Sequence, residues 1–269
     1  MGEMENALLS SRIAPLSTWR ETVLPREHGS WSLALEPLVF GLIVAPSVAG
    51  GWLAVAVIAA FFARRPLRIA WSESRPARRQ DAIVSLAACG VIALLGFAAA
   101  VAVGGVGRMV WLMPTMLAGA CFLAYDLRNG GREEVAEIAG AGAFALLPMA
   151  LAALDGAAPG VAMALGVVMC ARAIPAVMGV RAALRAAKTG VRRPTAALVA
   201  AFVALLATAA LVRLELAPAM AFVAVAVLTL KTLALLVYPR FPLRARTLGM
   251  VEAILGVAYV IAVGVAWRA

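Results

Sequence analysis

The sequence predicts an all-α fold, a polytopic membrane bundle of about nine transmembrane helices. Three observations lead to this prediction. The 269 residues are 64% hydrophobic and only 14% charged, whereas a soluble domain is about half apolar and a quarter charged. The apolar residues form long segments, most of them near the roughly 20 residues that cross the hydrocarbon core of a bilayer. The basic residues lie mainly in the short loops between those segments.

The predicted spans follow one another along almost the whole chain. The second is short by itself, so we expect it to extend into Gly50–Gly51 and past Pro66; alternatively, the first two spans form a re-entrant pair. We assign residues 1–30 to a cytoplasmic N-terminal segment and residues 31–269 to one transmembrane domain. The spans are predicted at residues 31–47, 52–63, 82–103, 109–125, 135–154, 160–179, 195–212, 217–238 and 248–267.

The distribution of lysine and arginine predicts the orientation. The N-terminal segment and the loops on its side hold 19 of these residues, whereas the loops on the other side hold three. Basic residues concentrate in cytoplasmic loops, so we expect the N-terminus inside and the C-terminus outside a bacterial cytoplasmic membrane. The same rule explains the net charge of +10 without a nucleic-acid partner. The basic loops are residues 64–80, 126–134, 180–194 and 239–247.

Several ionisable residues fall within the spans, where a charge is costly and often functional. All of them lie toward the predicted cytoplasmic half, which suggests a polar cavity open to the cytoplasmic leaflet. The alternative is that the three acids simply form structural ion pairs with the two bases. The acids are Glu36, Glu137 and Glu252, the bases are Arg172 and Lys231, and Asp81 and Asp126 stand at inner span ends.

The segment PREHGSW, residues 25–31, is the densest polar cluster and contains Arg26, Glu27 and His28. His28, Ser32 and Glu36 are spaced four residues apart, so they share one face of a helix. His28 could carry protons or cap the helix at the membrane surface. It is the only histidine, and we predict no metal site.

Two further clusters flank later spans. Tyr125 and Asp126 precede an Asn-Gly-Gly turn signal, and Glu137 follows it at the start of the fifth span. Arg181 and Arg185 lie four apart on an amphipathic stretch. Such a stretch could lie on anionic lipid or bind a phosphate group.

Three motifs resemble the YwiC-like family of bacterial membrane proteins. They are PREHGSW at residues 25–31, RRPL beginning with Arg64 and Arg65, and RAIP beginning with Arg172, which is followed by Arg181 and Arg185. The resemblance implies a membrane protein and adds little chemistry.

The topology also resembles, more distantly, the UbiA superfamily of intramembrane prenyltransferases. Their nine-helix architecture implies that residues 64–81 and 172–194 cap a cytoplasmic cavity. Those enzymes hold magnesium on two Asp-rich motifs, because Mg²⁺ bridges carboxylates to a diphosphate. Here the first loop offers only Glu73 and Asp81, and no acid occurs between Asp155 and Glu215. This departure argues against a magnesium cofactor.

We therefore expect a prenyltransferase-like membrane protein that binds a lipid-soluble or anionic lipid substrate, such as an isoprenoid or a quinone. Whether it is an enzyme stays open. The alternatives are a proton-coupled transporter and a non-catalytic assembly factor of a membrane complex. The candidate catalytic residues are Arg26, Glu27, His28, Glu36, Arg172 and Glu252, and the candidate substrate-binding residues are Arg64, Arg65, Asp81, Tyr125, Asp126, Glu137, Arg181, Arg185 and Lys231.

Overall fold

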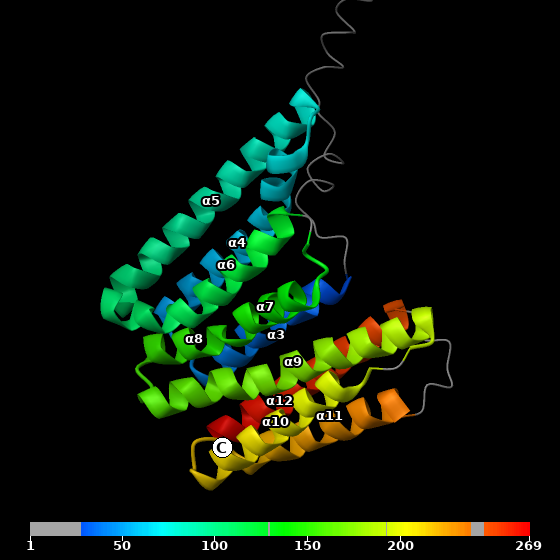
Figure 1. Cartoon of the computed structure of the whole chain (residues 1–269). Coiled ribbons are helices and arrows are strands. Elements are labelled where there is room, and N and C mark those ends of the chain that lie inside the picture. Colours follow the sequence, from blue (N-terminus) through cyan, green and yellow to red (C-terminus); the bar gives the residue numbers. More distant parts are fainter. Residues whose placement is uncertain (1–27, 129, 192, 238–244) are drawn as a thin grey trace, which may run out of the picture. The chain divides into compact units, whose positions relative to one another are not determined.

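The computed structural model describes residues 28–128, 130–191, 193–237 and 245–269. Every regular element within these ranges is a helix, which confirms the all-α prediction (Figure 1). The elements are α3 (His28–Val44), α4 (Val48–Ser72), α5 (Pro76–Gly104), the 3-10 helix η1 (Val106–Leu112), α6 (Met113–Leu127), α7 (Glu134–Ala145), α8 (Leu147–Asp155), α9 (Pro159–Thr189), α10 (Thr195–Arg213), α11 (Ala219–Val237) and α12 (Ala245–Arg268).

Eight segments of the described chain are long and apolar enough to cross a membrane. Two of them combine adjacent elements, η1 with α6 and α7 with α8. The first predicted span corresponds to α3, whose apolar part, Trp31–Val44, is shorter. The structure therefore confirms a polytopic helical membrane protein.

Two predicted loops are largely helical, which corrects the sequence prediction. Helix α9 continues beyond residue 179 to Thr189 and ends at Gly190, whose φ of 71° suits glycine. Helix α4 continues past Pro66 to Ser72, as expected, and α5 begins at Pro76. Alanine, arginine and leucine dominate the extension of α9, and all three favour helix. The charged residues Arg181, Arg185 and Lys188 end the hydrophobic run without ending the helix.

The fifth predicted span is broken. Helix α7 ends at Ala145, and α8 begins at Leu147 with Pro148 in its first turn. Proline is tolerated at a helix start because the N–H it lacks would have no partner there. The predicted span at residues 135–154 is confirmed as the segment Glu134–Asp155, which consists of these two helices.

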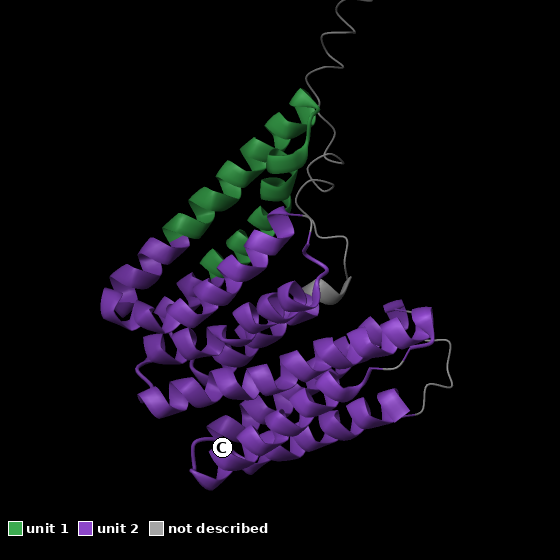
Figure 2. Ribbon diagram, in the orientation of Figure 1, with its two compact units in different colours: residues 1–26, 55–95 green, residues 27–54, 96–269 purple. Residues whose placement is uncertain are grey.

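The chain divides into two compact units (Figure 2). Unit 1 includes residues 55–95, which form most of α4 and α5, and unit 2 includes residues 27–54 and 96–269. Within unit 1, Arg78 pairs with Glu73 at 3.1 Å, and Arg79 donates a hydrogen bond to the carbonyl of Ala70. These contacts tie the end of α4 to the start of α5.

Helix α9 is central to unit 2, where it packs against α7, α8, α10 and α11, and α12 packs against α3 (Figure 1). The core combines a few large side chains, including Phe40, Leu165 and Met169, with many alanines. Small residues allow membrane helices to approach closely. Gly41 shows this, because a Cβ there would overlap the side chain of Leu151.

Short connections make α9, α10, α11 and α12 antiparallel in succession, and this places polar residues of these helices together. Helices α9 and α11 end on the side where α10 and α12 begin, since 190–194 and 238–244 are short links. Large apolar side chains such as Leu206, Leu230 and Ile254 are exposed on the outside of the helices. An apolar exterior and a partly polar interior are expected of a protein surrounded by lipid.

Candidate functional site

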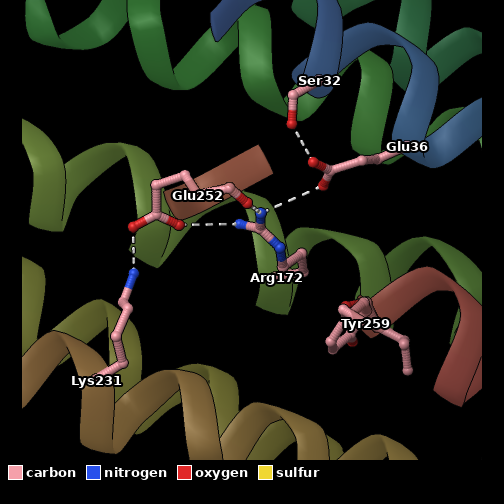
Figure 3. Close-up of polar contacts among 7 residues, drawn as sticks. Ser32, Glu36, Arg172, Lys231, Glu252 and Tyr259 are labelled. Carbon is pink, nitrogen blue, oxygen red and sulfur yellow. Dashed lines mark hydrogen bonds and ion pairs between the residues drawn. The ribbon is translucent and has the colours of Figure 1, made fainter. Parts of the chain in front are cut away.

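Arg172, from the middle of α9, is the centre of a buried polar cluster (Figure 3). Its side chain is 3% exposed. Nη2 lies 3.3 Å from Oε2 of Glu36 on α3, and Nη1 lies 3.6 Å from Oε2 of Glu252 on α12. Nη2 also donates a 2.7 Å hydrogen bond to the backbone carbonyl of Glu252. One guanidinium therefore links three helices, which its rigid fork of donors suits.

The cluster continues at both ends. Lys231 on α11 forms an ion pair with Oε1 of Glu252, and Ser32 on α3 donates a hydrogen bond to Oε1 of Glu36. We call the series Lys231, Glu252, Arg172, Glu36 and Ser32 the ion network (Figure 3). It joins α11, α12, α9 and α3 in one polar path through unit 2.

Burial is greatest at Arg172 and decreases from there along the ion network toward Lys231. The exposed fraction of the side chain is 7% for Glu36, 13% for Glu252 and 22% for Lys231. The two acids and the two bases have formal charges that sum to zero. An isolated charge is very costly in a medium of low dielectric constant, so mutual pairing is what permits these residues to be buried.

Two other residues of α12 fix the geometry. A Cβ added at Gly256 would overlap the carboxylate of Glu36, so α12 can approach α3 this closely only with glycine at that position. Tyr259 is buried, and its hydroxyl donates a 2.8 Å hydrogen bond to the carbonyl of Val168 on α9. Sequence reasoning missed both residues. Their spacing of four and seven residues from Glu252 places all three on one helix face, and that signal could have found them.

A small cavity lies between α9 and α11, next to the ion network. Its volume is about 10 Å³, roughly what one water molecule needs. Nε of Arg172 is buried and has no hydrogen-bond partner among the described residues. The lining residues are Ala171, Arg172, Pro175, Ala176, Val225, Leu228, Thr229, Lys231 and Thr232.

A second cluster joins the start of α7 to the C-terminal part of α9. Arg181 contacts Oε2 of Glu137 at 2.5 Å and donates a 2.9 Å hydrogen bond to the carbonyl of Arg132. Arg185 lies 3.3 Å from Glu134. Glu137 thus pairs with Arg181 and not with Arg172 or Lys231, because it stands at the start of α7, opposite the helical extension of α9.

The structure brings some predicted site residues together and leaves others apart. Glu36, Arg172, Lys231 and Glu252 meet in the ion network, while Asp126 is buried at the end of α6 beside Gly131. The backbone carbonyl of Tyr125 accepts a hydrogen bond from Gly130. Three other predicted site residues belong to unit 1, whereas the ion network lies in unit 2: Arg64, Arg65 and Asp81.

Three of the predicted site residues stand near the N-terminus. Arg26 and Glu27 lie outside the described residues, and the same holds for the side chain of His28, whose backbone begins α3. In the part of the chain that the structure describes, no group of three or more His, Cys, Asp or Glu side chains is arranged to hold a metal ion.

The fold and the ion network define a class: a polytopic helical membrane protein with a charge-balanced buried cluster. Residues 24–154 match the family described as YwiC-like protein, so the family resemblance inferred from the motifs is confirmed for this part of the chain. The match includes Ser32 and Glu36, whereas Arg172, Lys231 and Glu252 follow it in the sequence. No curated protein and no solved structure gives a significant match. The UbiA likeness stays a prediction.

Gly256→Ala should lower the free energy of unfolding by about 1–3 kcal/mol, the usual cost of overpacking. The added methyl group would displace the Glu36 carboxylate, which Arg172 and Ser32 hold in place. Gly249→Ala is the matched control on α12, since a Cβ there meets nothing within 4 Å, and it should be neutral or slightly stabilising. Unfolding titrations in mixed micelles measure both. Equal effects of the two substitutions would contradict the close approach at Gly256.

Arg172→Met should destabilise by about 3–5 kcal/mol, because it leaves two buried acids facing one base. Adding Glu36→Gln restores the charge balance, because one acid, Glu252, then faces one base, Lys231. The double variant should therefore be more stable than the sum of the single effects predicts, by about 0.5–3 kcal/mol. Arg185→Met, which removes an exposed pair, should cost about 1 kcal/mol or less. Strict additivity in the double variant would show that Arg172 and Glu36 are not coupled.

Proposed function

We propose that this chain is a multi-pass protein of a bacterial cytoplasmic membrane that binds a lipid-soluble or anionic lipid ligand beside Arg172 and Lys231. The observation that carries the proposal is the cavity between α9 and α11. Both basic residues line it, and Nε of Arg172 is a buried donor without a partner. Buried polar groups nearly always have a partner, so an unused donor at a cavity favours a bound group.

The surroundings of the cavity suit a ligand that arrives from the bilayer. Val225, Leu228 and Ala176 provide apolar contact on the lining, and Lys231 is partly exposed at one side. A cavity of about 10 Å³ does not enclose a whole lipid. The polar end of the ligand would enter, and its apolar body would lie along the outside of α9 and α11.

Proton movement is a second candidate function, and the continuity of the ion network favours it. Lys231, Glu252, Arg172 and Glu36 form an unbroken series of ion pairs across four helices. Ionisable chains inside membranes often carry protons. In this alternative, the cavity would hold a water that links the network to its surroundings.

The orientation is part of the proposal, with the basic loops on the cytoplasmic side. Two positions test it in a variant whose cysteines, Cys89, Cys121 and Cys170, are replaced by alanine. Ala158→Cys, before α9, should react with a membrane-impermeant maleimide added to intact cells. Val191→Cys, after α9, should react only once the membrane is opened. Both positions are exposed, so the reverse pattern would mean the opposite orientation.

Ligand binding is tested by native mass spectrometry of the protein extracted from its own membrane in mild detergent. We expect one specific lipid or isoprenoid compound to remain bound, and Arg172→Lys to remove it, because lysine keeps the charge but lacks the guanidinium donors. Arg185→Lys, in the surface cluster, is the matched control and should retain the ligand.

The other outcomes decide between the remaining functions. If no lipid is enriched and proteoliposomes show a proton flux that Glu252→Gln abolishes, proton movement would replace ligand binding as the proposed function. A stoichiometric partner protein without a lipid and without flux would point to an assembly factor. If Arg172→Lys retained the same lipid, the lipid would bind somewhere other than this cavity.

A further inference from the structure

Pro175 removes one backbone donor from α9 next to the cavity. It lies inside α9 and has no N–H, so the carbonyl of Ala171, four residues earlier, has no intrahelical donor. Ala171 and Pro175 both line the cavity. In membrane helices, carbonyls freed by proline are satisfied by neighbouring side chains or by ordered polar groups. The nearby hydroxyls do not serve this purpose, because Thr232 donates to Leu228 and Thr229 donates to Ala201.

Arg172, the next residue of α9 after Ala171 and also part of the lining, has a donor without a partner among the described residues, Nε. The residue is 97% buried, since its exposed fraction is 3%, and its Nη atoms are occupied by Glu36 and Glu252. The remaining N–H has no partner in the described ranges. The residues that carry this donor and the acceptor without its helical N–H both line the cavity. A hydroxyl group can satisfy both, because it donates one hydrogen bond and accepts others.

The charge balance of the ion network selects against an anion. Glu36 and Glu252 already neutralise Arg172 and Lys231. A phosphate or carboxylate in the cavity would add a negative charge with no cation left to compensate it, and such burial is strongly unfavourable. An uncharged oxygen adds no charge, and its size matches a cavity of about 10 Å³.

We infer that the cavity between α9 and α11 binds the uncharged hydroxyl end of a lipid-soluble alcohol. The hydroxyl accepts from Nε of Arg172 and donates to the carbonyl of Ala171, and the alkyl chain leaves past Leu228 and Thr229. This inference rests on the proposed ligand-binding function and narrows its ligand class. Water fills the same position when no ligand is bound.

Two probes with the same chain test the inference: oleyl alcohol and oleyl phosphate, titrated into the full-length protein in lipid nanodiscs and followed by native mass spectrometry. Oleyl alcohol should bind saturably with one molecule per protein, and oleyl phosphate should bind at least about tenfold more weakly. Equal or tighter binding of the phosphate would overturn the inference. Phosphate binding that Arg172→Lys abolishes would still uphold the proposed function, whereas saturable binding of neither probe would remove both.

Pro175→Ala is the decisive variant. It supplies the missing N–H, so the Ala171 carbonyl is paired within α9 and the hydroxyl loses its acceptor. The loss of one hydrogen bond should weaken oleyl alcohol binding about three- to tenfold. Pro66→Ala removes another helix-interior proline, in α4, which is not among the lining residues, and should leave binding unchanged. Pro175→Gly restores the same N–H without a new side chain, and it should reproduce the loss. Unchanged affinity in both Pro175 variants would refute the role of the Ala171 carbonyl.

Discussion

The pairing of Arg172 with two carboxylates is the interaction on which unit 2 depends. A guanidinium so deeply buried cannot be solvated by water. In a membrane, the lipid that surrounds the bundle cannot solvate it either. It is therefore compensated by acids from two other helices, Glu36 from α3 and Glu252 from α12. Each of these helices must stay in place for the charge to remain paired, so the ion network is also a constraint on helix packing.

This constraint gives a role to residues that have no charge. Gly256 allows the Glu36 carboxylate to lie against α12, and Tyr259 joins the same helix to α9 through the Val168 carbonyl. The alanines of the core let the helices come close enough for the ion pairs to form. The ion pairs therefore depend on the close apolar packing of the same helices.

The same geometry defines the chemistry available beside the network. Because the formal charges of its acids and bases sum to zero, the ion network has no excess charge with which to attract an ion. What it offers a ligand is single hydrogen-bonding groups that have no partner among the described residues. Pro175 and Arg172 provide two of these in one small space. The proposed recognition of one polar atom at the end of an apolar molecule rests on these two groups.

The sequence by itself determined that the protein is a helical membrane bundle, because hydrophobic length and the distribution of basic residues are local properties of the chain. It also singled out Glu36, Arg172, Lys231 and Glu252, since a charge within an apolar segment is visible without coordinates. Only the tertiary structure decided which of them pair, because the partners come from four separate helices. It also paired Glu137 with Arg181, extended α9 through a predicted loop and placed Arg172 and Pro175 together at one cavity. These outcomes depend on how the helices pack against one another, and no single segment of the sequence encodes that.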